Sequence, residues 1–140
     1  MPPVTDDQLA ATWHAMMANV QHLSCRLDRE LGAAHGISSS EFEALQQLQR
    51  ADQRKMRMAE LAEHTHLTQS ALSRLIGRLE RDGLVTREVC LSDRRSVWTQ
   101  ITEAGLALYR KARATQRSIL RQETATCPDL ERGAGQSASR

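Results

Sequence analysis

Arg74 and Arg78, spaced four residues apart, stand out among the side chains that could bind a charged partner. A guanidinium group can donate two hydrogen bonds to guanine or pair with a phosphate, and hydroxyl or amide groups can bond to base edges or backbone oxygens. At about 100° per residue, a helix from Gln69 to Asp82 would place these arginines on one polar face, opposite an apolar face. That polar face also carries Gln69, Ser70, Ser73, Gly77 and Arg81. The pattern predicts contact with duplex DNA, and a solvated face of an ordinary amphipathic helix is the alternative.

A second pair of arginines lies between two segments that alternate like β-strands, residues 84–89 and 96–101. Residues 91–95 would form the tip of this hairpin. Arg94 and Arg95 can enter a minor groove or lie along phosphates, and Asp93 can hold one guanidinium in place by a charge-assisted hydrogen bond. An arginine-tipped hairpin after a polar helix favours DNA binding over the alternative.

The elements around these residues predict a helix-turn-helix. Thr68 can cap the start of the polar helix and itself face DNA, and Gly83 can end the helix in the left-handed conformation. Residues 59–64 predict a preceding helix, and residues 65–67 have the length of a tight corner. Leu61 and Leu67 would then hold the two helices together.

Longer helices flank this unit. Thr5 with Gln8 forms a capping box at the start of a helix that we expect to reach Gly32, and Ser38 with Glu41 forms a second one, for a helix ending near Arg50. Thr102 can cap a last long helix to about Glu123. The first helix carries an apolar seam, which could be buried within one subunit or pair two subunits. The seam residues are Leu9, Trp13, Met16, Val20, Leu23 and Leu27.

Several runs of residues are specific when taken together. They are Leu61-Ala62-Glu63, Leu67-Thr68-Gln69-Ser70-Ala71-Leu72-Ser73-Arg74-Leu75, Leu79-Glu80-Arg81-Asp82-Gly83-Leu84-Val85, and Asp93-Arg94-Arg95-Ser96-Val97 through Ile101-Thr102-Glu103-Ala104-Gly105. These runs resemble the MarR family of bacterial winged helix-turn-helix regulators. The resemblance implies a homodimer that binds a pseudo-palindromic operator in double-stranded DNA, usually as a repressor, with a small-molecule effector weakening the complex.

The fold class that follows is mainly α with a small β-hairpin wing, in a single domain of residues 1–140. Residues 56–101 would form the winged helix-turn-helix, and residues 5–32 and 102–123 the long dimerisation helices. Residues 127–140 are poor in apolar side chains and predict a mobile tail. The family commonly completes its dimer with a further C-terminal helix, and this sequence departs from that pattern.

The resemblance also implies an effector site where the dimer helices meet the DNA-binding part. Its candidates are Trp13, Met17, Phe42 and Tyr109, each of which could instead be a core residue. With four aromatic residues in the chain, the chemistry of the effector cannot be inferred from stacking.

Charge is distributed unevenly along the chain. Residues 1–67 carry 6 basic and 9 acidic residues, and residues 68–117 carry 10 basic and 5 acidic residues, within a total net charge of +2. Because phosphate contacts supply much of the affinity for DNA, this local surplus supports the predicted DNA-binding part. No run approaches the roughly 20 apolar residues that cross a bilayer, and nothing resembles a secretion signal, so we expect a cytoplasmic protein without membrane contact.

Other functions have weaker support. His22 with Cys25, or His64 with His66, could begin a metal site, but two ligands do not complete one, and we expect neither a metal nor another cofactor. Cys25 or Cys90 could serve a thiol-redox variant of the regulator, although three widely spaced cysteines predict no disulfide framework. The apolar seam could serve a helical interaction module that does not bind DNA. An enzyme is not expected, because the chain has no phosphate-binding glycine loop and no nucleophile elbow.

Overall fold

The computed structural model describes residues 2–89, 92 and 96–123, and the predicted tail at 127–140 lies outside this part. Its helices are α1 (Asp6–His35), α2 (Ser39–Arg50), α3 (Met58–Thr65), α4 (Gln69–Arg81) and α5 (Glu103–Glu123), with a short 3₁₀ turn at Asp52–Arg54. Its strands are β1 (Lys55–Arg57), β2 (Val85–Val89) and β3 (Val97–Ile101). The predicted fold class, mainly α with a small β wing, is confirmed.

The predicted helix starts are also confirmed. The capping boxes at Thr5 and Ser38 are both formed, and the Thr68 hydroxyl accepts a hydrogen bond from the amide of Ala71 at 3.1 Å. The Thr102 hydroxyl accepts from the amide of Gly105 at 3.0 Å. These caps satisfy amides of the first helical turn that have no partner within the helix, which is why short local patterns predict them well.

One strand was missed by the sequence prediction. Among the described residues the strands form an antiparallel sheet in the order β1-β3-β2, so the wing hairpin has an additional edge strand just before α3. In β1, Met56 pairs with Thr99 and is buried. A strand of three residues is too short to show an alternating pattern, and only its pairing with β3 defines it.

The core lies where α2 meets the helix-turn-helix, the sheet and α5. Phe42, Leu45 and Leu48 of α2 are almost completely buried, as are Leu61 of α3 and Leu106 of α5. Ile37, which lies just before the cap of α2, is buried as well. This core fixes the position of α3 and α4 relative to the long helices.

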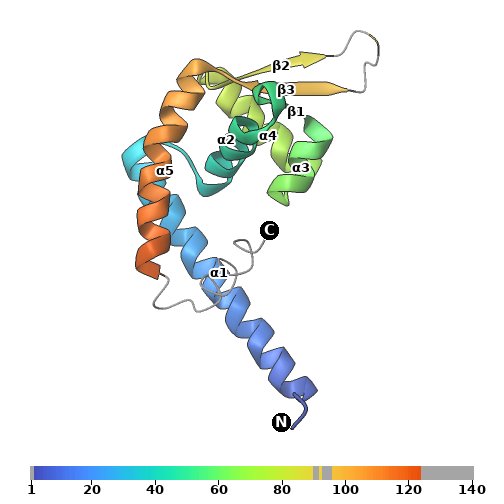
Figure 1. Cartoon of the computed structure of the whole chain (residues 1–140), viewed down its shortest axis with the longest axis vertical. Coiled ribbons are helices and arrows are strands. Elements are labelled where there is room, and N and C mark those ends of the chain that lie inside the picture. The colour runs from blue at the N-terminus through green and yellow to red at the C-terminus, as the bar shows by residue number, and fades with distance from the viewer. Residues whose placement is uncertain (1, 90–91, 93–95, 124–140) are drawn as a thin grey trace.

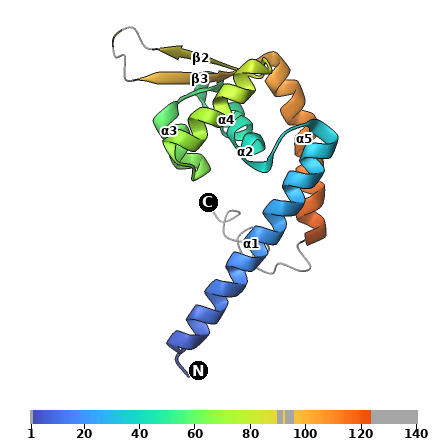
Figure 2. The same ribbon diagram turned by 180° about the vertical axis from the view of Figure 1, so that it is seen from behind.

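The first helix extends beyond its predicted end at Gly32 to His35, and Gly36 ends it with a φ of 72°. Its C-terminal part packs along α5, where His35 Nε2 lies 2.7 Å from the Thr115 hydroxyl and Arg26 pairs with Glu123 at 2.6 Å. Its N-terminal part projects away from the rest of the chain (Figures 1 and 2).

The two interpretations of the α1 seam therefore apply to different parts of the helix. Leu27 is buried and Leu23 is partly buried within the chain. Leu9, Trp13 and Val20 are 57%, 64% and 60% exposed, and Met16 and Met17 are exposed as well. The single chain thus leaves an apolar face uncovered on the N-terminal part of α1.

Candidate DNA-binding surface

Helix α4 has the two opposite faces that the sequence predicts. Leu72, Leu75, Ile76 and Leu79 are buried against the core. The predicted DNA-contacting residues on this side of the molecule are all exposed: Thr68, Gln69, Ser70, Ser73, Arg74 and Arg78. A buried apolar stripe thus holds the helix in place while its polar side chains face outward.

The corner between α3 and α4 is held by its own hydrogen bonds. His66 takes the left-handed conformation with a φ of 58° and ends α3. The Thr65 hydroxyl donates to the carbonyl of Leu61 at 2.6 Å, and the amide of Leu67 donates to the carbonyl of Ala62 at 3.2 Å. Leu61 is fully buried and Leu67 packs partly against the same core. The predicted helix-turn-helix corner is confirmed.

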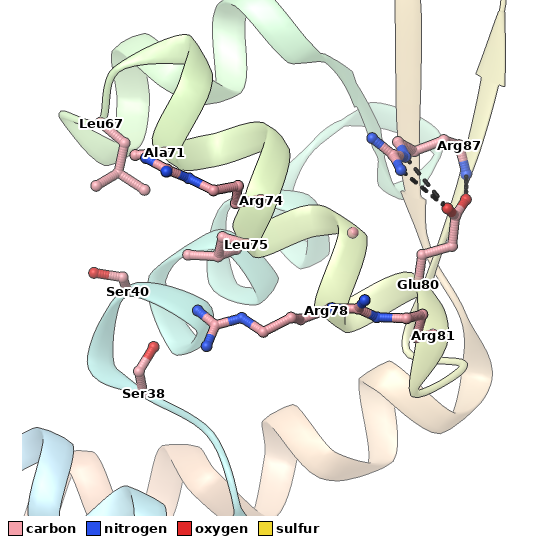
Figure 3. Close-up of a pocket in the computed structure, with 11 residues that line it drawn as sticks. Ser38, Ser40, Leu67, Ala71, Arg74, Leu75, Arg78, Glu80, Arg81 and Arg87 are labelled. Atoms are coloured by element: carbon pink, nitrogen blue, oxygen red, sulfur yellow. Dashed lines mark hydrogen bonds and ion pairs between the residues drawn. The ribbon is translucent and has the colours of Figure 1, made fainter.

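The two central arginines of α4 have different surroundings. The Arg78 Nη2 atom lies 4.0 Å from Glu41 Oε1, and Figure 3 shows this side chain reaching toward Ser38 and Ser40 at the start of α2. Arg74 forms no ion pair with any residue in the described part of the chain. Arg74 is therefore free to donate to a base, whereas Arg78 lies toward the edge of the surface.

Arg87 of β2 joins the wing to α4, a contact that the sequence prediction missed. Its amide donates to Glu80 Oε2 at 3.1 Å, and its Nη2 donates to Glu80 Oε1 at 3.2 Å (Figure 3). The same guanidinium would lie 3.9 Å from a Cβ placed on Gly77, which is an ordinary van der Waals distance. The Arg87 side chain therefore lies over Gly77 without a steric clash. The end of α4 and a turn lie between Glu80 and Arg87 in the sequence, so no local sequence pattern indicates their contact. Only the angle between α4 and β2 brings the two side chains together.

A cleft of about 380 Å³ separates the start of α3 from the wing. Arg57 and Arg87 line it together with Gln69 and Ser73 of α4. Arg57 also lies over the ring of Trp98, 5.1 Å from its centroid, in a cation–π contact that holds its side chain beside the sheet. Arg57 and Arg87 extend the predicted set of basic residues beside α4.

Two other sets of predicted site residues are the tip of the wing and the effector candidates. Asp93, Arg94 and Arg95 lie outside the described residues, and their contact with DNA stays a prediction. Of the four effector candidates, Phe42 and Tyr109 are buried and stack with ring centroids 5.5 Å apart. Trp13 and Met17 are exposed on the projecting part of α1, so the single chain does not bring the four together.

Alternative sites gain little from the structure. No group of three potential metal ligands occurs within the part of the chain that is described. Cys25 is a free, exposed thiol, and Cys90 lies outside the described residues. No helix in the described ranges is long and apolar enough to span a bilayer.

The basic surplus of residues 68–117 is not confined to the DNA-binding surface, which corrects the interpretation of the charge distribution. Arg110, Lys111, Arg113 and Arg117 lie on α5. They account for four of the ten basic residues of that segment. The charge count along the chain ran across two predicted elements, the winged helix-turn-helix and the long helix that follows it, and therefore combined their charges.

Two helices joined by a tight corner, an outward polar helix and a β-sheet wing define a winged helix-turn-helix protein. The model of the MarR family matches residues 35–96. The structure of Sco3205, a MarR family transcriptional regulator from Streptomyces coelicolor in complex with DNA, superposes with a TM-score of 0.82 at 27% identity, over 99% of this chain and 88% of that one.

Two further relatives are also transcriptional regulators by name. AbsC, a MarR family transcriptional regulator from the same organism, gives a TM-score of 0.74 at 29% identity over 96% of this chain and 99% of its own. The homoprotocatechuate degradative operon repressor of Escherichia coli is 28% identical over 94 residues, which are 67% of this chain and 62% of the length of that repressor. Residues 35–96 of the chain thus match the MarR family, and nearly the whole chain shares the fold of solved MarR family transcriptional regulators.

Proposed function

We propose that the protein is a homodimeric transcriptional repressor that binds a pseudo-palindromic operator in double-stranded DNA and is released by a small-molecule effector. The observation that carries this proposal is the polar face of α4, exposed and held rigidly by a buried apolar stripe. The relative from Escherichia coli is named a repressor, and the structure of Sco3205 contains DNA, which supports the same activity in this chain. A regulator of this kind acts where the chromosome lies, so we expect the protein in the cytoplasm.

In the proposed complex, α4 enters the major groove and Arg74 reads a base edge, with Gln69, Ser70 and Ser73 near the helix start. Arg78 pairs with a phosphate, because it already lies at the edge of this surface toward α2. Arg57 and Arg87, beside the cleft, contact the backbone between α4 and the wing. The sequence adds Arg94 and Arg95 as minor-groove or phosphate contacts.

The proposed dimer rests on the apolar face of α1. A two-fold pair presents two recognition helices about one turn of DNA apart, or roughly 34 Å, whereas a lone chain could read only half a site. The exposed side chains of Leu9, Trp13 and Val20 provide an apolar surface of the kind that pairs subunits.

The test compares the affinities of single arginine variants of the protein for operator DNA and for random DNA. We expect Arg74→Ala to reduce specific operator affinity by about 1 to 3 kcal/mol, the value of a good base contact, with a smaller effect on random DNA. Arg78→Ala should instead weaken both DNAs alike and lower the slope of log affinity against log salt by about one. Mobility-shift titrations at several salt concentrations measure both quantities.

Arg121→Ala is the matched control for this experiment, because it removes one exposed arginine from α5 and leaves α4 unchanged. Its operator affinity should equal that of the wild type. An unchanged operator affinity for Arg74→Ala would overturn the base contact. An operator affinity that does not fall with salt would argue against DNA binding through arginines altogether.

A further inference from the structure

Glu80 places a negative charge on the side of α4 that carries the exposed arginines. A cavity of about 880 Å³ borders this side of the helix, and its charged lining consists of Arg74, Arg78, Glu80, Arg81 and Arg87. Glu80 is the only carboxylate among the described residues that line it. Because a carboxylate repels the phosphates of DNA, Glu80 by its charge alone weakens DNA binding at this place.

Both carboxylate oxygens of Glu80 bind one residue, Arg87 of β2. Oε2 accepts a hydrogen bond from the backbone amide of Arg87 at 3.1 Å (Figure 3). Oε1 accepts from Nε at 3.4 Å and from Nη2 at 3.2 Å. Charge-assisted hydrogen bonds of this kind fix the orientation of a guanidinium as well as its distance. Because the amide belongs to the strand itself, Glu80 holds both the side chain and the backbone of β2 at this point.

This contact anchors a part of the wing that the core does not hold. Val85, the first residue of β2, is buried, whereas residues 86–89 of the same strand are exposed. Among the described residues, the pair of Arg87 with Glu80 is the ion pair that joins this exposed part to α4. A hairpin held only at its base can rotate about that base, so the second attachment fixes the angle between the wing and α4.

Arg87 lies where α4, the wing and the proposed DNA meet. Its side chain lines both the cavity of about 880 Å³ and the cleft of about 380 Å³ between α3 and the wing. The side chain is 32% exposed, so a ligand can reach it. None of the three hydrogen bonds to Glu80 uses Nη1, and this nitrogen can therefore still donate to a phosphate oxygen.

We propose that Glu80 is a positioning residue for DNA binding. It holds β2 and the guanidinium of Arg87 at the angle to α4 at which Arg87 meets the DNA backbone, and it does not touch DNA itself. This role rests on the proposed operator complex, in which Arg87 contacts the backbone between α4 and the wing. Segments that are ordered before binding lose less conformational freedom when a complex forms. The fixed orientation of the wing outweighs the repulsion between one carboxylate and the phosphates.

The test uses the DNA duplex that the wild-type protein enriches most strongly from a random pool, and a shuffled duplex of the same composition. We expect Glu80→Ala to lower affinity for the enriched duplex by about tenfold, because Arg87 and the wing must then be ordered on binding. The slope of log affinity against log salt should fall by about one, since the phosphate contact of Arg87 is lost. Mobility-shift titrations at several salt concentrations measure both. Charge repulsion alone predicts the opposite sign, and a rise in affinity for both duplexes would overturn the proposal.

Asp82→Ala is the matched control, because it removes the same charge from an exposed position at the end of α4. Asp82 forms no ion pair within the part of the chain that is described. The affinity of this variant for both duplexes should stay the same or rise slightly. A Glu80→Ala variant that binds the enriched duplex as tightly as the control would also contradict the role of Glu80.

A double-mutant cycle tests whether Glu80 acts through Arg87. In an Arg87→Ala background, Glu80→Ala should lower affinity much less than in the wild type, because only the hydrogen bond to the backbone amide remains to be lost. Fully additive losses would give Glu80 a separate role and contradict the proposal. Glu80→Gln keeps one oxygen acceptor for Arg87 and should recover part of the affinity lost in Glu80→Ala. A glutamine variant without any recovery would argue against a role through these hydrogen bonds.

Two measurements without DNA complete the test. Thermal melting verifies that each variant folds, which we expect because the Glu80 side chain is 40% exposed. Hydrogen exchange at the amide of Arg87 should be faster in Glu80→Ala and unchanged in Asp82→Ala, and equal exchange in both would show that Glu80 does not anchor β2. A wild type that enriches no duplex would overturn the proposed function, whereas a wild type that binds its duplex no better than Glu80→Ala does would overturn only the role of Glu80.

Discussion

Gly105→Ala should destabilise the protein by about 3 kcal/mol, at the upper end of what overpacking a dense interior usually costs. A Cβ on Gly105 would lie 2.2 Å from the carbonyl oxygen of Leu84 and 2.7 Å from Cγ1 of Ile101. Real side chains do not approach backbone atoms so closely, so the start of α5 would have to move away from the wing.

Hydrogen bonds at this junction resist that movement. The carbonyl of Leu84 accepts from the amide of Thr102 at 3.0 Å, and the Thr102 hydroxyl donates to the carbonyl of Gly83 at 2.7 Å. The same hydroxyl caps the first turn of α5 through the amide of Gly105. Displacing Gly105 therefore breaks a helix cap and the link between wing and helix together.

Urea unfolding at a fixed protein concentration measures the effect, and two other glycines serve as controls. A Cβ added to Gly32 would meet no atom of another element within 4 Å, and one added to Gly77 would meet only Arg87, at 3.9 Å. Both lie inside helices, so their alanine variants should gain up to about 1 kcal/mol from helix propensity. A Gly105→Ala variant as stable as the Gly32 control would show that the start of α5 can move away from the wing at little cost in stability. A Gly77→Ala variant that is stable but binds the operator poorly would indicate that DNA comes close to this glycine.

Val20→Asp should convert the proposed dimer into monomers and reduce operator affinity by about two orders of magnitude. Val20 is 60% exposed in the single chain, so an aspartate there costs the isolated fold little. In a paired α1 surface the same carboxylate would be buried without a partner, which is strongly unfavourable. A monomer would then keep one recognition helix and lose the second half-site.

Sedimentation velocity at micromolar concentration and a mobility shift measure these two results. Ala18→Asp is the matched control, because it adds the same charge to an exposed position on the opposite side of α1. Leu23→Asp is a poorer choice, since Leu23 already packs partly against the core of its own chain. A Val20→Asp variant that sediments as a dimer, or a wild type that sediments as a monomer, would contradict the proposed assembly.

Local patterns predicted much of this fold because local contacts determine those features. Each helix cap joins residues three apart, and the two faces of α4 follow from its helical period. The corner at His66 and the turn at Gly83, with a φ of 74°, are likewise decided within a few residues. For the same reason the polar residues of the recognition helix could be identified without a structure.

Features that depend on distant segments could not be predicted in this way. Strand β1 exists through its pairing with β3, whose residues follow it by more than forty positions. The angle between α4 and β2 alone brings Arg87 to Glu80. The effector site that includes Trp13 and Tyr109 stays a prediction, and within the single chain Trp13 is exposed whereas Tyr109 is buried.

The sequence by itself determined the class of the protein, the capped starts of its helices and the exposed polar face of α4. Only the tertiary structure decided where the charge of the chain lies in space. It placed Arg57 and Arg87 beside the basic residues of α4, and it left the N-terminal face of α1 uncovered. The physical reason is that caps and helical periodicity act over a few residues, whereas the packing of α2, α4 and α5 depends on contacts between segments far apart in the chain.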